Sequence, residues 1–205
     1  MKFHVLPAAA LLIGVLAASS VRAADQATVD AAAPVFTLPD AYGKTHALAD
    51  YRGKYVVLEW VNFDCPFVHK HYGSGAMQTL QRAVTEQGII WLSVCSSAPG
   101  KQGYFAGKDL HERIAEEKAS PTAYLLDTEG TVGRAYGAKT TPHMFVIDPK
   151  GVVIYAGGID DIASTDFDDI GRATNYVKGA VEAAMAGKPV PVKTSRSYGC
   201  SVKYK

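Results

Sequence analysis

The residue whose surroundings most favour chemistry is Cys65, which follows the apolar run 55–63 and immediately precedes Pro66. Such a run is typical of a buried strand, and proline is favoured at the first position of a helix. A cysteine between the two lies at a helix N-terminus, where free backbone N–H groups and the helix dipole stabilise a thiolate. The sequence therefore predicts a nucleophilic cysteine with a lowered pKa; a buried structural thiol is the alternative interpretation.

Three basic residues follow on the same predicted helix, His69, Lys70 and His71. His69 stands four residues after Cys65 and shares its helical face, so it or Lys70 would add positive charge beside the thiolate. Asp64 would oppose that charge. For the three basic residues we prefer the simpler interpretation of a solvated helix face.

The elements that must position Cys65 form one domain of strands and helices. Strands are predicted at 35–38 and 45–48, which form a hairpin, and at 55–63, 89–94, 124–126, 143–147 and 152–156. Helices are predicted from Pro66, with an interruption near 73–75, and at 109–118 and 170–185. The turn sequence at 148–151 indicates that the strands on either side of it are antiparallel.

Composition and charge exclude several classes of protein. Of 205 residues, 48% are hydrophobic, and 21 Lys and Arg balance 20 Asp and Glu to a formal net charge of +1. This composition is that of an ordinary globular domain. The charge balance argues against a strongly basic nucleic-acid-binding protein and against an acidic disordered chain. Three cysteines are too few for a disulfide scaffold.

The N-terminus has the pattern of a signal peptide. Lys2 precedes an apolar run at 5–18, and the small-residue pattern at 21–23 is typical of a cleavage site. The run is shorter than the ~20 residues that a membrane-spanning helix needs. We expect a signal peptide at 1–23, a leader at 24–33 and export to the periplasm or beyond, where disulfides are permitted. An uncleaved anchor is the alternative.

Three segments of the chain together resemble the thioredoxin superfamily. They are the strand at 55–63 with residues 64–68, the segment 126–137, and the run 140–148. Within that superfamily the chain is similar to the redoxin branch, the alkyl hydroperoxide reductase/thiol-specific antioxidant group, and to its exported peroxiredoxin-like members. The resemblance implies a thioredoxin-like three-layer α/β domain at 34–187 with a central mixed sheet, followed by a tail at 188–205.

The resemblance also implies roles for individual residues. Pro66 would start the helix that lowers the pKa of Cys65. Thr141 and Pro142 would form a cis peptide that faces Cys65 and docks the backbone of an extended substrate. On this basis we expect an exported thiol-disulfide oxidoreductase that attacks protein or small-molecule disulfides through Cys65, without a cofactor or a bound metal.

One departure from the family pattern concerns the second thiol. Val68 stands where the family's paired-cysteine motif has its second cysteine, so the resolving thiol must be Cys95, Cys200 or a cysteine of a partner protein. Cys95 ends a predicted buried strand, where an inert thiol is the default. Cys200 lies in a tail that has no helix or strand period, and we prefer it as the resolver.

A second departure bears on peroxide chemistry. Family members that reduce peroxides have the pattern Thr-x-x-Cys at the reactive cysteine. In this chain the position of the threonine is occupied by Asn62, which lacks the hydroxyl group. Arg134 is a candidate for the arginine of a peroxide pocket, although a surface helix position is the interpretation we prefer. Thiol-dependent peroxidase is therefore the alternative function.

A copper- or zinc-binding redox module is a further alternative. Thiolate and imidazole groups are the ligands that these metals prefer. The residues that carry such groups near the predicted site are Cys65, His69, His71, His143 and Cys200. The spacing of Cys65 and His69 is compatible with one helix face, but the chain has no Cys-x-x-Cys pair.

Overall fold

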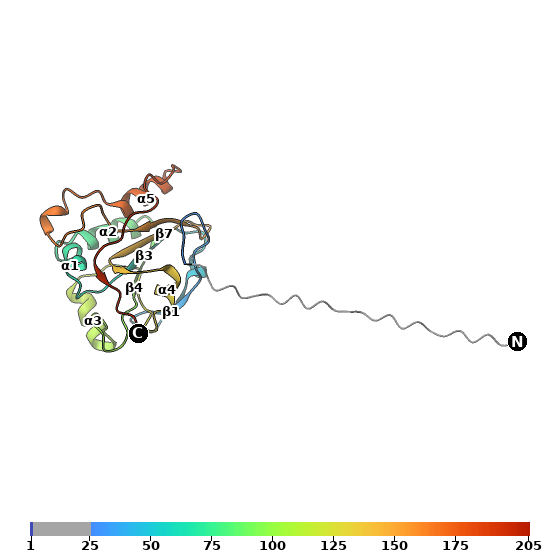
Figure 1. The fold of residues 1–205 in the computed structure, drawn as a ribbon, viewed down its shortest axis with the longest axis horizontal. Helices are drawn as coiled ribbons and strands as arrows, with labels where there is room; N and C mark the ends of the chain where they lie inside the picture. Colours follow the sequence, from blue (N-terminus) through green and yellow to red (C-terminus); the bar gives the residue numbers. More distant parts are fainter. Residues whose placement is uncertain (2–25) are drawn as a thin grey trace.

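The computed structural model describes Met1 and residues 26–205, so the predicted signal peptide at 1–23 and its cleavage site lie outside the described residues. Five strands form a central mixed sheet in the order β5-β4-β3-β7-β8 (Figure 1). They are β3 (Val56–Trp60), β4 (Ile90–Cys95), β5 (Ala123–Leu126), β7 (His143–Ile147) and β8 (Val153–Gly157). Strands β3, β4 and β5 are parallel, while β7 is antiparallel to both β3 and β8.

The central strand β3 is buried on both faces. Val57 and Val61 pack into one core, whereas Leu58 and Trp60 pack into the other. Side chains of a strand alternate between the two faces of its sheet, so a strand covered on both sides needs apolar residues in succession. This explains the near-continuous apolar run in the sequence.

Two layers cover the sheet. One layer consists of α1 (Pro66–Gly73), α2 (Ala76–Thr85), α3 (Gly107–Glu116) and α5 (Tyr176–Met185). The other contains the hairpin β1 (Thr37–Pro39) and β2 (Thr45–Ala47), the short helix η1 (Leu48–Tyr51), and α4 (Thr131–Tyr136). Among the described residues, no helix has the length and apolar character that spanning a membrane requires. The three-layer α/β fold with an N-terminal hairpin agrees with the sequence-based prediction.

The last predicted helix begins later than expected. The sequence predicts a helix at 170–185, but α5 begins at Tyr176 and is preceded by a short 3-10 helix, η2 (Phe167–Asp169). Asn175 is the N-cap of α5, and its side-chain oxygen accepts a hydrogen bond from the Lys178 backbone N–H at 2.9 Å. An N-cap residue has extended backbone dihedrals, so the helix cannot extend to residues before Asn175.

Both ends of the segment 26–205 are attached to the domain. In the segment predicted as a leader, Ala27 N–H donates to the Ala135 carbonyl at 2.9 Å and Ala33 N–H to the Gly151 carbonyl at 2.9 Å. At the other end, the tail contains a two-residue strand, β9 (Cys200–Ser201), which pairs with β6 (Thr140–Thr141). Figure 1 shows this red C-terminal segment crossing the domain beside α1.

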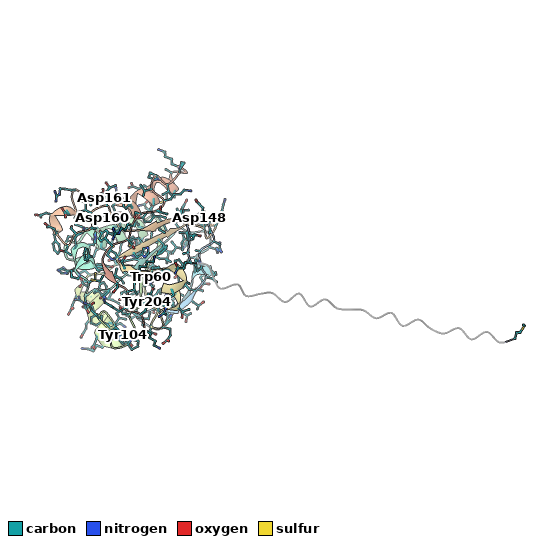
Figure 2. The ribbon with its side chains drawn as sticks, viewed as in Figure 1. Trp60, Tyr104, Asp148, Asp160, Asp161 and Tyr204 are labelled. Carbon is teal, nitrogen blue, oxygen red and sulfur yellow. The ribbon has the colours of Figure 1, made fainter. Side chains whose placement is uncertain are left out.

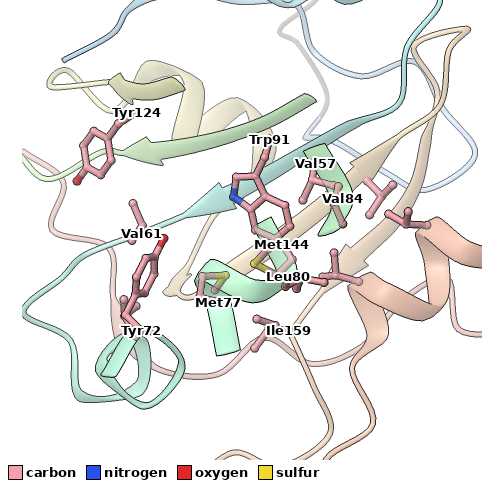
Figure 3. Packing of buried hydrophobic residues seen from close by; sticks show 14 of the residues in the cluster. Val57, Val61, Tyr72, Met77, Leu80, Val84, Trp91, Tyr124, Met144 and Ile159 are labelled. Atoms are coloured by element: carbon pink, nitrogen blue, oxygen red, sulfur yellow. The ribbon is translucent and has the colours of Figure 1, made fainter. Parts of the chain in front are cut away.

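A buried carboxylate lies within the core under α1 and α2. Glu59 is fully buried and accepts hydrogen bonds from Trp91 Nε1 at 2.9 Å, Ser93 Oγ at 2.7 Å, Gln81 Nε2 at 3.2 Å and Tyr72 OH at 3.1 Å. Trp91 and Tyr72 are labelled in Figure 3, where both lie among apolar side chains of this core. Burial raises the pKa of Glu59, and the hydrogen bonds only partly offset this effect.

We predict that Glu59 makes the stability of the protein fall as the pH rises. A raised pKa means that the folded state holds a proton which the unfolded state releases near the ordinary value of 4.5, so stability is lost between 4.5 and the raised pKa. Glu59→Gln should remove this loss. The measurement is urea unfolding at a series of pH values, with the exposed Glu182→Gln as the control. Parallel stability curves for wild type and Glu59→Gln would contradict the prediction.

Candidate active site

Cys65 lies at the N-terminus of α1, as the sequence predicts. It is the N-cap residue, with Pro66 at the first helical position. Its backbone N–H donates to the Asn62 carbonyl at 3.0 Å, and its carbonyl accepts from His69 N–H at 2.8 Å. A tight turn after β3 therefore delivers the cysteine to the start of the helix.

The sulfur of Cys65 faces the Thr141-Pro142 peptide and the tail. The Thr141-Pro142 bond is cis. The Cys65 thiol donates to the Thr141 carbonyl oxygen at 3.1 Å, and the Cys200 backbone N–H lies 3.4 Å from the Cys65 sulfur. Cys65 is 0% exposed, and the backbone of Cys200 in the tail lies against its sulfur.

Pairing of β6 with β9 brings the second thiol to the site. The two strands are antiparallel, with Thr140 opposite Ser201 and Thr141 opposite Cys200. Directly opposed residues project to the same face of a strand pair, so the Cys200 side chain lies beside that of Thr141 and near Cys65. All three cysteines, which fall within the described residues, are free thiols in this structure.

The pKa values of the two neighbouring thiols are shifted in opposite directions. Burial raises the pKa of Cys65, but hydrogen bonds from the side chains of Cys200 and Thr141 and from the backbone N–H groups of Cys200 and Val68 bring it below the ordinary value of 9.0. Burial and the adjacent Cys65 raise the pKa of Cys200 to about 11. Cys65 therefore ionises first.

The third thiol belongs to the core. Cys95 is buried at the end of β4, and its thiol donates to the Gly103 carbonyl at 3.4 Å. Burial raises its pKa. These surroundings favour the neutral thiol, which is a poor nucleophile.

The prediction of a solvated basic helix face is wrong for two of its three residues. His69 is exposed, but Lys70 and His71 are buried. Lys70 Nζ donates to the Ile162 carbonyl at 2.9 Å and lies 3.5 Å from a carboxylate oxygen of Asp160. The loop after β8 and the tail pack against this side of α1, so the buried charges are paired rather than solvated.

The same buried cluster contains Tyr198, which the sequence analysis did not single out. Its hydroxyl donates to Asp160 and lies 3.2 Å from His71 Nε2. Burial and the nearby Lys70 lower the pKa of His71 to about 3, so its imidazole is neutral at neutral pH. No local sequence pattern marks these residues, because they come from a helix, a loop and the tail.

Asn62 shapes the turn before Cys65. Its side-chain oxygen accepts from the Asp64 N–H at 2.9 Å, and its side-chain nitrogen donates to the Gln102 carbonyl at 3.4 Å. Its amide is thus occupied within the turn and with the neighbouring loop. The side chain that replaces the family's threonine therefore has a structural use in this chain.

The arginine nearest to this turn is not the one considered from the sequence. Arg134, on α4, donates to the Glu129 carbonyl at 2.7 Å and lies over the Tyr204 ring. Arg113, on α3, donates to the Phe63 carbonyl at 3.1 Å and lies 3.6 Å from the Asp64 carboxylate. Arg113 is closer to Cys65 in the sequence than Arg134 is, so only the packing of α3 against this turn decides which arginine lies near the site.

The residues considered as metal ligands do not form a cluster. Within the described part of the chain, no group of three or more His, Cys, Asp or Glu side chains is arranged to hold a metal ion. His143 is buried, and its Nδ1 accepts from the Lys139 N–H at 3.3 Å. Burial and Lys139 lower the pKa of His143 to about 4.

Comparisons with known proteins show the fold and the family of this chain. The thiol-disulfide oxidoreductase ResA of Geobacillus thermodenitrificans is 31% identical over 125 residues, which are 61% of this chain and 66% of that protein. The structure of an uncharacterized conserved protein from Geobacillus kaustophilus superposes with a TM-score of 0.73 at 24% identity, over 87% of this chain and 93% of the other.

A second structure identifies the fold. It is the thioredoxin domain of a thiol-disulfide oxidoreductase from Bacteroides vulgatus, which superposes with a TM-score of 0.52 at 19% identity, over 71% of this chain and 96% of that domain. The predicted thioredoxin-like fold is thereby confirmed. The sequence profile of the AhpC/TSA family matches residues 29–156, more than half of the chain. The chain therefore belongs to the AhpC/TSA family.

Proposed function

We propose that the protein is an exported thiol-disulfide oxidoreductase in which Cys65 and Cys200 alternate between dithiol and disulfide. The observation that carries the proposal is the position of the Cys65 sulfur, at a helix N-terminus, 3.1 Å from the Thr141 carbonyl and 3.4 Å from the Cys200 N–H. The lowered pKa of Cys65 supplies the thiolate that disulfide exchange requires.

The proposed reaction transfers two electrons. The dithiol form reduces a disulfide RSSR to two RSH, and the sulfurs of Cys65 and Cys200 become bonded to each other. Both protons of the dithiol end on the released thiols, so atoms and electrons balance. A second dithiol or two monothiols then restore the reduced protein by the reverse exchange.

The contacts support the roles that we propose for these residues. Pro66 begins the helix whose Val68 N–H helps to lower the pKa of Cys65, and the cis peptide of Thr141 and Pro142 presents the carbonyl that accepts a hydrogen bond from the Cys65 thiol. The redox domain spans residues 34–187, and the tail at 188–205 carries the second thiol. The names of the ResA relative and of the protein that contains the thioredoxin domain support thiols and disulfides as the partners.

Export is part of the proposal. The apolar run at 5–18 and the small-residue pattern at 21–23 support a signal peptide cleaved after Ala23. A periplasmic or secreted location permits a disulfide between Cys65 and Cys200 to persist.

Thiol-dependent peroxide reduction is the second candidate, because the chain belongs to the AhpC/TSA family. A thiolate reacts with peroxide to form a sulfenic acid, which a second thiol resolves. Against this candidate, the Asn62 amide is used by the Asp64 N–H and the Gln102 carbonyl. The first candidate needs no hydroxyl at that position.

We predict that Cys65 accounts for the first thiolate to form as the pH rises. Its pKa lies below 9.0, whereas that of Cys95 is raised above it. Ultraviolet absorbance of the thiolate should show an early titration that Cys95→Ser retains and Cys65→Ser loses. Cys200→Ala should move the titration to higher pH, because it removes a hydrogen bond to the Cys65 sulfur. An early titration that survives in Cys65→Ser would show that the reactive thiol is misassigned.

We also predict that disulfide exchange requires both cysteines of the pair and exceeds peroxide turnover. Cys65→Ser should abolish exchange with a model disulfide. Cys200→Ser should lower it by about tenfold or more when external thiol is below the millimolar effective concentration typical of a tethered group. Cys95→Ser is the matched control and should retain activity. Rapid peroxide consumption that depends on Cys65 and outpaces exchange at equal thiol supply would favour the second candidate.

A further inference from the structure

Three contacts hold the tail against α1. The Tyr198 ring packs edge-on against that of Phe67, with the ring centres 5.8 Å apart. The ammonium group of Lys70 lies 5.6 Å from the centre of the Tyr198 ring, and the Tyr198 hydroxyl lies 3.2 Å from His71 Nε2. All three partners belong to α1, the helix that begins at Cys65. One helix therefore contacts the tail and also fixes the position of the Cys65 sulfur.

A buried carboxylate completes this anchor. The Tyr198 hydroxyl donates to Asp160, whose carboxylate also lies 3.5 Å from Lys70 Nζ. The backbone of Asp160 forms a β-bridge with Asn175, the N-cap residue of α5, so the carboxylate is held in place. Lys70 is 0% exposed and Asp160 is 4% exposed. A hydrogen bond to a charged group is stronger in such surroundings than at the surface, because water is largely excluded.

A short piece of chain connects this anchor to the second thiol. Only Gly199 separates Tyr198 from Cys200. Gly199 has a φ of +121°, and a methyl group on it would overlap the Thr141 carbonyl oxygen, so the tail passes directly against the cis peptide. The Cys200 N–H then lies 3.4 Å from the Cys65 sulfur. The position of Tyr198 is thus passed on to Cys200 with little freedom.

The tail has a second anchor beyond β9. The Val202 N–H donates to the Lys139 carbonyl at 3.1 Å, and the Tyr204 hydroxyl donates to the Ala138 carbonyl at 2.8 Å. These carbonyls lie after α4, so the second anchor holds the end of the tail to a different part of the domain. Figure 2 labels Asp160 and Tyr204, one residue from each anchor. Of these two anchors, the first is the one that joins the tail to α1.

The second thiol is in place before any disulfide forms. The cysteines are free thiols in this structure, yet the Cys200 side chain already lies within hydrogen-bonding reach of the Cys65 sulfur. Two reacting groups that are held in place have an effective concentration far above the millimolar value of a flexible tether. Without the anchor, the tail would have to become ordered at every oxidation. The disulfide would then be less stable relative to the dithiol.

We propose that Tyr198 is a positioning residue, which holds Cys200 beside Cys65 in the dithiol state by binding Asp160 and α1, and thereby sets the stability of the Cys65–Cys200 disulfide. This inference rests on the proposed function, since it requires that disulfide. Tyr198 takes no part in the exchange of electrons. It acts through the piece of chain that joins it to Cys200.

The reaction that reports this stability is exchange with glutathione. The reduced protein and one glutathione disulfide give the oxidised protein and two molecules of glutathione. The bond between the Cys65 and Cys200 sulfurs forms, the bond of glutathione disulfide breaks, and both thiol protons pass to glutathione. The protein is oxidised and glutathione disulfide is reduced. The equilibrium constant of this exchange is the effective concentration of the two protein thiols.

The test measures this equilibrium constant in the full-length protein. The protein is equilibrated from the reduced and from the oxidised side in glutathione buffers of known ratio. Free thiols are trapped with N-ethylmaleimide, and the Cys65–Cys200 peptide pair is quantified by mass spectrometry. Tyr198→Ala should lower the constant by about tenfold or more, which raises the reduction potential by about 30 mV or more. A constant equal to that of the wild type would overturn the proposal.

A pair of conservative variants tests the role of the hydroxyl. Tyr198→Phe keeps the ring against α1 but removes the hydrogen bond to Asp160, and it should lower the constant by about threefold or more. Tyr204→Phe is the matched control, because it removes one tyrosine hydroxyl from the second anchor of the same tail. It should lower the constant less than Tyr198→Phe does. Equal losses in the two variants would overturn the assignment of the positioning role to Tyr198.

Two further controls separate positioning from folding. Tyr42→Ala removes a tyrosine that is 72% exposed and stacks on His111, so it should leave the constant unchanged. Circular dichroism of each variant shows whether the domain has folded. If Tyr198→Ala does not fold, Tyr198→Phe decides the question, and a constant equal to that of the wild type would again overturn the proposal.

Failure of the two proposals is distinguishable in the same experiment. If the wild-type protein forms no Cys65–Cys200 disulfide at any ratio of glutathione to its disulfide, the proposed function fails and the inference fails with it. If the disulfide forms, but the Tyr198 variants that fold have the wild-type constant, only the inference fails.

Discussion

The antiparallel pairing of Thr141 with Cys200 is the interaction on which the site depends. It places the Cys200 N–H near the Cys65 sulfur, covers that sulfur, and brings a second thiol to a helix N-terminus that has no local partner cysteine. A hydrogen bond to the sulfur favours its ionised form. The same two-residue strand pair therefore controls the exposure, the acidity and the proposed redox partner of Cys65.

Buried polar groups maintain this pairing. Lys70 and Asp160 form an ion pair with exposed fractions of 0% and 3%, and Tyr198 connects that pair to the tail. A buried ion pair is weak support for stability, but removal of one partner leaves an uncompensated charge. The cluster instead fixes one position of the tail, because Tyr198 donates to Asp160 only when the tail is docked. Glu59 has a comparable role beneath the helices, where it joins β3, β4, α1 and α2 through four donors.

Membership of the AhpC/TSA family leaves two proposed reactions open, peroxide reduction and disulfide exchange, and the geometry of the site favours the second. The chain belongs to the AhpC/TSA family, and its site contains a helix-capping cysteine with a lowered pKa. Around it, however, Asn62 is committed to the turn, Arg134 contacts Tyr204, and the tail occupies the edge of β6. These features favour exchange between two cysteines of one chain over an open peroxide pocket.

The sequence by itself determined the alternation of strands and helices, the break near Gly75 and the position of Cys65 at a helix start, because each depends on neighbouring residues and their periodicity. The sequence-based prediction was wrong about the start of α5, which is set by the Asn175 N-cap. It was also wrong to place Lys70 and His71 in solvent. Only the tertiary structure decided that the tail docks beside Thr141 and that Tyr198 meets Asp160. Those contacts join residues that are far apart in the chain, so their free energies depend on the packing of the whole domain and leave no periodic trace in the sequence.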